Sequence, residues 1–159
     1  MEGADDSGDR IGERIAWFGG YKEAWMSETK PRVLLVDDEP DIVKTIGKRL
    51  EVAGFEVITA IDGQQALDRA HADHPDAMVL DLMLPKYSGL KVCSMLKQED
   101  ASKHIPIIIY TGKDQVVDQA ACRDCGADAY IPKALGVSVL ITEITALLKK
   151  AQESAPGRA

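Results

Sequence analysis

The stretch Val33-Leu34-Leu35-Val36-Asp37-Asp38 joins four apolar residues directly to two carboxylates. A short, continuously apolar run is typical of a strand that is buried on both faces, as in a parallel sheet. Three later runs have the same form, and they are 77–80 before Asp81, 106–110 before Thr111 and 129–132 before Lys133. Because the carboxyl ends of parallel strands meet at one edge, where ligands bind, we expect three carboxylates, a hydroxyl and an ammonium to lie there together.

Strand-like runs alternate with amphipathic helical ones through the middle of the chain. Strands are predicted near 32–37, 55–60, 76–81, 105–111 and 127–131, and helices near 39–53, 63–73, 87–99, 114–125 and 135–150. Alternating β and α segments with short connections are typical of a parallel sheet covered by helices. The predicted fold class is therefore α/β, a five-stranded parallel sheet with helices on both faces.

The 159 residues suffice for one domain with modest tails. We assign residues 31–150 to this domain and residues 151–159 to a flexible tail. Residues 1–30 form an N-terminal extension that holds four of the eight aromatic residues of the chain between positions 17 and 25. Three interpretations of this extension stay open: a docking peptide, a segment that packs on the domain, or an addition upstream of a true start at Met26.

Composition excludes several classes of protein. A formal net charge of −7 argues against direct binding to nucleic acid or to an anionic membrane. No apolar stretch approaches the roughly 20 residues of a membrane span, and three cysteines, an odd number, favour a reducing compartment. The pair Cys122 and Cys125 has the spacing of a redox or zinc site, but inert buried or half-buried thiols are the better interpretation. We expect a cytoplasmic protein.

The polar residues at the predicted strand tips indicate phosphoryl chemistry. Adjacent carboxylates repel each other unless a cation neutralises them, and Mg²⁺ prefers oxygen ligands. Asp37 and Asp38 are therefore candidate metal ligands, and Asp38 is also a candidate N-cap for the helix that follows. Thr111 and Lys133 supply a hydroxyl and an ammonium for phosphate oxygens. Together these residues predict an aspartyl-phosphate site with Asp81 as the nucleophile.

The segment 31–150 resembles the receiver domain of two-component response regulators. The resemblance is carried by Asp37 and Asp38, by Asp81 with Pro85 and Gly89, by Thr111 with Gly112, by Gly126-Ala127-Asp128-Ala129-Tyr130, and by Lys133. It implies a CheY-like, flavodoxin-like doubly wound (βα)5 fold with strand order 2-1-3-4-5. It also implies a domain that is not a conventional enzyme but catalyses its own phosphorylation and dephosphorylation.

The resemblance further implies a role for each matched residue. Asp81 would be the phosphoacceptor for a histidine kinase or phosphotransfer protein. Asp37, Asp38 and Asp81 would bind Mg²⁺ together with the backbone carbonyl of Met83, and Lys133 would contact the phosphoryl group.

Two further pairs of residues would govern switching and the lifetime of the phosphorylated state. Thr111 and Tyr130 would move on phosphorylation and remodel the face formed by the fourth predicted helix, the fifth strand and the fifth helix. That face would bind a downstream protein, and the sequence leaves open whether the domain forms a homodimer on phosphorylation. Met83 and Lys113 would shield the acyl phosphate from water and slow its hydrolysis.

The chain departs from the family pattern beside Lys133. The family normally places proline after this lysine with a cis bond, whereas Pro132 precedes Lys133 and Ala134 follows it. A cis Lys133–Ala134 bond would cost about 2.5–4 kcal/mol. Either the loop is remodelled or this strain is tolerated.

Several functions remain in competition. A stand-alone receiver is favoured because nine residues after Lys150 are too few for a helix-turn-helix. The alternatives are a receiver module cut from a longer regulator or hybrid histidine kinase, and a phosphorylation-independent binding module. An aspartate-nucleophile phosphatase is disfavoured because Met83 stands where such enzymes place a second aspartate. A dinucleotide enzyme is disfavoured because no G-x-G-x-x-G follows the first strand.

Overall fold

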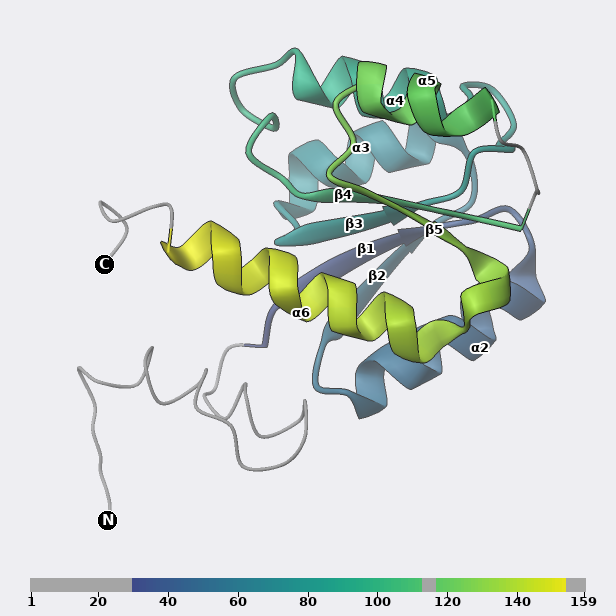
Figure 1. Cartoon of the computed structure of the whole chain (residues 1–159), viewed down its shortest axis with the longest axis vertical. Helices are drawn as coiled ribbons and strands as arrows, with labels where there is room; N and C mark the ends of the chain where they lie inside the picture. The colour runs from purple at the N-terminus through teal and green to yellow at the C-terminus, as the bar shows by residue number, and fades with distance from the viewer. Residues whose placement is uncertain (1–29, 113–116, 154–159) are drawn as a thin grey trace.

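The computed structural model describes residues 30–112 and 117–153. The strands are β1 (Arg32–Val36), β2 (Glu56–Ala60), β3 (Ala77–Leu80), β4 (Ile107–Thr111) and β5 (Ala129–Pro132). The helices are α2 (Pro40–Val52), α3 (Gly63–Asp73), α4 (Gly89–Lys97), α5 (Val117–Asp124), the 3-10 turn η2 (Lys133–Leu135) and α6 (Val137–Glu153). All five strands are parallel and lie in the order β2-β1-β3-β4-β5, which confirms the predicted fold class and strand order (Figure 1).

Two hydrophobic layers cover the two faces of the sheet, because successive side chains of a strand point to opposite sides. In β1, Val33 and Leu35 pack with α2 and α6, whereas Leu34 and Val36 pack with α3 and α4. In Figure 1, α3, α4 and α5 lie above the sheet, and α2 and α6 lie below it. The central strands β1, β3 and β4 are almost entirely buried, which explains why their sequences are continuously apolar.

Several helices begin at residues other than the predicted ones, and α6, for example, begins at Val137 instead of residue 135. The prediction that Asp38 caps the first helix is wrong, since α2 has Glu39 at its N-cap position without a side-chain capping bond. Pro40 suits the first position of α2, where no intrahelical N–H donor is needed. Helix α4 begins at Gly89 instead of residue 87, because the side chain of Ser88 accepts a hydrogen bond from the N–H of Lys91 and caps the helix there.

The C-terminal helix is longer than predicted. Residues 151–153 belong to α6, so the predicted end at residue 150 is wrong by three residues; alanine, glutamine and glutamate all propagate a helix well. The rest of the predicted tail, and residues 1–29 of the predicted N-terminal extension, lie outside the described residues. Even α6, with 17 residues, falls short of a membrane span, and no other helix in the described part of the chain qualifies.

The register of the sheet brings the polar strand tips together. Val36 pairs with Leu80, so the next residues, Asp37 and Asp81, lie side by side at the ends of neighbouring strands. The backbone continues this alignment for one more residue, since the N–H of Asp81 donates to the carbonyl of Val36 over 3.0 Å. On the other side, Thr111 pairs with Pro132, which places Lys133 directly beyond the end of β4.

Candidate functional site

A pocket of about 370 Å³ opens at the carboxyl ends of β1, β3, β4 and β5. It is lined by Asp38, Glu39, Asp81, Met83, Thr111, Gly112 and Lys133. Five of these residues were predicted as site residues from the sequence. Glu39 and Gly112 were not, although each directly follows a predicted residue and is carried into the pocket by it.

Three carboxylates form an acidic cluster in and beside this pocket. Asp37, Asp38 and Asp81 each place one oxygen within 4.8 Å of the others. Asp37 and Asp81 are 2% and 7% exposed, whereas Asp38 is open to solvent. A set of oxygen donors that combines buried carboxylates with solvent access fits Mg²⁺, which keeps several of its waters when it binds. Within the described residues this is the one group of three or more acidic, histidine or cysteine side chains with such spacing.

Lys133 lies across the acidic cluster. Its Nζ donates to Oδ2 of Asp37 over 2.6 Å and lies 3.7 Å from Oδ2 of Asp81. The other carboxylate oxygen of Asp37 accepts a hydrogen bond from the N–H of Glu39 over 2.9 Å. Asp37 is therefore held from both sides, which explains how a carboxylate can be almost completely buried in this fold.

Burial and the neighbouring charges shift two pKa values in the pocket. Burial raises the pKa of Asp81, and the charge of Asp37 adds to this effect, while Lys133 and the backbone amides of Leu82 and Met83 counteract it. Burial by itself would lower the pKa of Lys133, but the hydrogen bond to Asp37 and the charge of Asp81 outweigh it, so that this pKa is raised. Lys133 is thus a firmly protonated cation beside a nucleophile that is costly to ionise.

The remaining predicted site residues differ in burial and in their position relative to the pocket. Thr111 is fully buried at the end of β4 and lines the pocket. The side chain of Met83 is 56% exposed at the pocket rim. Tyr130 is half-buried on β5 against the core layer under α3, α4 and α5, and it lines a separate pocket of about 260 Å³. Lys113 lies outside the described residues.

The loop that follows Lys133 is remodelled relative to the pattern expected from the family. Residues Lys133–Leu135 form the 3-10 turn η2, with Pro132 in extended conformation before it. Every peptide bond in the described residues, including Lys133–Ala134, is trans. Of the two alternatives left open by the sequence, the remodelled loop is the one observed.

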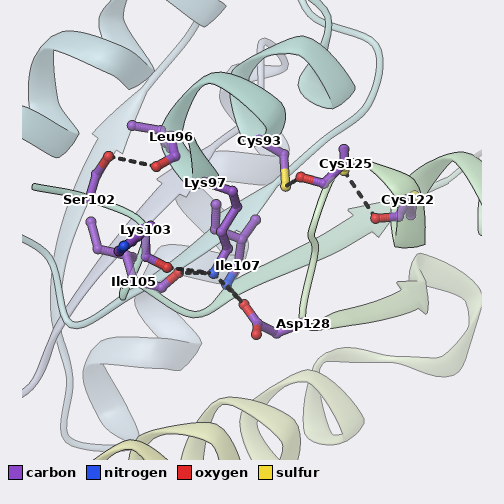
Figure 2. Close-up of polar contacts among 10 residues, drawn as sticks. All are labelled: Cys93, Leu96, Lys97, Ser102, Lys103, Ile105, Ile107, Cys122, Cys125 and Asp128. Carbon is purple, nitrogen blue, oxygen red and sulfur yellow. Dashed lines mark hydrogen bonds and ion pairs between the residues drawn. The ribbon is translucent and has the colours of Figure 1, made fainter. Parts of the chain in front are cut away.

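A second group of polar contacts lies at the opposite ends of β4 and β5, and Figure 2 shows it. The Nζ of Lys97 donates to the carbonyls of Ile105 (2.7 Å) and Lys103 (3.2 Å) and to Oδ2 of Asp128 (2.9 Å). The same Asp128 oxygen accepts the N–H of Ile107 over 2.8 Å. One ammonium therefore ties the end of α4 to the starts of two strands.

The three cysteines lie close to this group (Figure 2). Cys93 and Cys122 are buried and Cys125 is half-buried, as predicted for structural thiols. Burial raises the pKa of the Cys93 thiol far above its ordinary value, so this sulfur stays protonated and unreactive.

Replacing Lys97 with methionine should lower the free energy of unfolding by about 2–3 kcal/mol, because the hydrogen bonds from this largely buried ammonium to two carbonyls and to Asp128 are lost together. Urea unfolding followed by circular dichroism measures this change. The matched control is Lys103→Met, since the Lys103 side chain is 59% exposed and pairs with the exposed Asp100. The assignment of Lys97 as a structural anchor fails if both variants change stability equally.

Comparison with known proteins places this architecture in a family. The sequence model of the response regulator receiver domain matches residues 33–145, and the chain belongs to that family. A separate pairwise match shows the chain to be 38% identical over 125 residues to the alkaline phosphatase synthesis transcriptional regulatory protein PhoP of Bacillus subtilis. This match covers 79% of this chain and 51% of PhoP. The chain thus spans about half the length of the curated relatives it matches.

Solved structures agree with this assignment. The CheY-like response regulator receiver domain protein of Methanospirillum hungatei superposes with a TM-score of 0.74 at 24% identity, over 79% of this chain and 98% of that one, and shows the shared fold. The phosphorylated cyanobacterial phytochrome response regulator RcpA superposes with a TM-score of 0.64 at 27% identity, over 75% of this chain and 91% of that one. Receiver domains of this family bind Mg²⁺ at an acidic pocket, and histidine kinases or phosphotransfer proteins are their expected partners.

Proposed function

We propose that this domain accepts a phosphoryl group on Asp81 in a reaction that requires Mg²⁺. The observation that carries the proposal is the convergence of three carboxylates and the Lys133 ammonium on one pocket at the strand ends. Asp81 is the acceptor, because it lines the pocket on the central strand tip and is within reach of Lys133. RcpA, a relative in fold and family, is described as phosphorylated, which supports the same chemistry here.

The donor is the phosphohistidine of a histidine kinase or phosphotransfer protein. A carboxylate oxygen of Asp81 forms a bond to phosphorus while the bond from phosphorus to the imidazole nitrogen breaks. The electron pair leaves with the imidazole, which then takes up a proton. Lys133 and the hydroxyl of Thr111 bind phosphoryl oxygens, and Asp37, Asp38 and Asp81, with the Met83 carbonyl, would hold Mg²⁺. When bound, Mg²⁺ supplies positive charge that offsets the charge of the transferring group.

The phosphorylated state is transmitted to a protein partner. Thr111 and Tyr130 shift toward the site, and the face made by α5, β5 and α6 changes with them. That face contacts a downstream protein or a second copy of the domain. The Met83 side chain at the pocket rim slows attack by water on the acyl phosphate.

A second candidate is the same receiver acting as a module of a longer regulator. The length comparison favours it, since the chain spans 51% of PhoP. In that case the same phosphorylation on Asp81 would control a second domain instead of a separate partner.

Intact-mass measurement after incubation with acetyl phosphate tests the proposal. We expect a gain of one phosphoryl group with Mg²⁺ and none with EDTA, followed by slow loss after the donor is removed. Because small donors bypass kinase recognition, absence of uptake with both acetyl phosphate and phosphoramidate would contradict the phosphoacceptor assignment. It would leave a phosphorylation-independent binding module as the better description.

A further inference from the structure

The segment between Asp81 and α4, residues 82–88, is closed by a backbone hydrogen bond that joins its first residue to the start of α4. The N–H of Gly89 donates to the carbonyl of Leu82 over 2.9 Å. A Cβ atom at position 89 would lie 2.1 Å from the carbonyl oxygen of Asp81, so only glycine fits there. This segment carries Met83, whose carbonyl is a proposed metal ligand, and its path therefore decides where that oxygen lies.

The middle of the same segment is hydrogen-bonded to the start of α3. The carbonyl of Pro85 accepts the N–H of Tyr87 over 2.8 Å and the N–H of Gly63 over 3.1 Å. A Cβ atom at position 63 would lie 2.6 Å from both the Cβ and the carbonyl oxygen of Tyr87. A side-chain rotation cannot relieve either contact, because both atoms are fixed by the Tyr87 backbone.

A strained residue and an ion pair lie at the same contact. Lys86 has a φ of 71°, in the left-handed region that non-glycine residues rarely adopt, and such a conformation persists only where its surroundings hold it. Its Nζ lies 3.6 Å from Oδ2 of Asp62. Asp62 is itself anchored, since its Oδ1 accepts the N–H of Gln65 over 2.8 Å and caps α3.

We propose that Gly63 is a positioning residue of the phosphoacceptor site. Its missing side chain lets the Tyr87 backbone approach α3, and this contact sets the path of residues 82–88 and so the place of the Met83 carbonyl. Mg²⁺ demands near-ideal geometry at about 2.0–2.1 Å from each ligand. Ordinary carbon contacts are about 3.5–4.0 Å, so a methyl group at position 63 would displace the segment by about 1 Å. Gly63 thus controls metal affinity without providing a ligand.

The variant Gly63→Ala tests this inference, which rests on the proposed function for the identity of the metal site. We expect isothermal titration with MgCl₂ to show a dissociation constant about tenfold higher than that of the wild type. Uptake from acetyl phosphate should be slower at low Mg²⁺ and should recover toward the wild-type rate at saturating Mg²⁺. A purely structural role would lower stability and leave the dissociation constant unchanged.

Gly47→Ala is the matched control. It also adds one methyl group to a helix, but there the nearest atom, Cγ1 of Val57, would lie at an ordinary 3.8 Å, so its Mg²⁺ affinity should equal that of the wild type. If Gly63→Ala does not fold, the double variant Gly63→Ala/Tyr87→Gly replaces it, because loss of the Tyr87 Cβ relieves one of the two clashes while the clash with the Tyr87 carbonyl oxygen remains. We expect weaker Mg²⁺ binding there as well.

The outcomes separate the two proposals. Wild-type Mg²⁺ affinity in a folded Gly63→Ala protein, or in the folded double variant, overturns the positioning role, whatever the phosphoryl uptake shows. A wild-type protein that binds Mg²⁺ but takes up no phosphoryl group overturns the proposed function instead, and the comparison of dissociation constants still decides the role of Gly63. A wild-type protein that binds no Mg²⁺ overturns both.

Discussion

Replacing Asp81 with asparagine is expected to abolish phosphoryl uptake and, in Mg²⁺-free buffer at neutral pH, to increase the free energy of unfolding. The loss of uptake follows because the amide offers no anionic oxygen to attack phosphorus. The gain in stability follows because a buried anion beside the Asp37 carboxylate is replaced by a neutral group of nearly the same shape. Lost function and gained stability together distinguish a functional carboxylate from one that supports the fold.

The pH dependence of this gain has a definite sign. Folding raises the pKa of Asp81, chiefly through burial, so the native protein binds the proton more tightly than the unfolded chain. The stability contribution of Asp81 is therefore most favourable below the unfolded-state pKa and declines as the pH rises through the native one. The amide of the Asp81→Asn variant does not titrate, so the difference between the two proteins should be largest at neutral pH and should shrink on acidification.

The size of the gain is limited by Lys133. Two like charges about 4 Å apart repel by about 4 kcal/mol at an effective dielectric constant of about 20. The Lys133 ammonium offsets part of this repulsion. We therefore expect the Asp81→Asn change to raise the free energy of unfolding by about 1 kcal/mol, within the usual range for a single substitution. Urea unfolding with EDTA at several pH values measures it. Equal stability at all pH values would show that Asp81 carries no electrostatic strain.

A control variant is available at a carboxylate of the same pocket. Glu39 lines the pocket but is exposed to solvent, so Glu39→Gln should change stability little. It should also keep phosphoryl uptake. Uptake by Asp81→Asn itself would contradict the assignment of the acceptor and direct attention to Asp37 or Asp38.

The layout of the sheet and the gathering of charged residues at one edge follow from the sequence by simple rules. Each central strand is continuously apolar because both of its faces are covered, and each ends at the first polar residue. Parallel strands align these ends, so Asp37, Asp81 and Thr111 had to converge once the strands were recognised. Their chemistry could therefore be predicted before the structure was known.

Other features depend on contacts between distant segments and could not be predicted. The backbone hydrogen bond between Gly63 and Pro85 forms because the turns after β2 and β3 lie on either side of the end of β1. Nothing in either local sequence indicates that contact. The loop after Lys133 is similar: the sequence shows only the shifted proline, and packing determines that η2 follows and that Lys133 contacts Asp37.

The Lys133→Ala variant should separate two effects that most site mutations combine. In Mg²⁺-free buffer the buried Asp37 carboxylate loses its 2.6 Å partner, and we expect the free energy of unfolding to fall by about 2–3 kcal/mol. This is below the loss for a fully buried pair, because the Lys133 side chain is 17% exposed. Lys149→Ala, an exposed lysine near the end of α6, is the control and should change stability by less than about 0.5 kcal/mol.

Mg²⁺ affinity and phosphoryl uptake should then change in opposite directions. Lys133 occupies Oδ2 of Asp37 and approaches Asp81, so it competes with a metal ion for the same carboxylates. Without it, Mg²⁺ should bind more tightly and restore much of the lost stability, since a ligand at about 100 times its dissociation constant contributes about 2.7 kcal/mol. Uptake from acetyl phosphate should nevertheless be slower by about 100-fold, because one donor to the transferring group is gone.

This pair of opposite effects is a strict test of how Lys133 acts. If the lysine served only to neutralise the acidic cluster, a tightly bound Mg²⁺ would replace it and uptake would be normal. If it were needed mainly to hold the pocket in shape, both metal binding and uptake would be lost together. Tighter Mg²⁺ binding with slower uptake is expected only if the ammonium contacts the phosphoryl group itself, in addition to balancing Asp37.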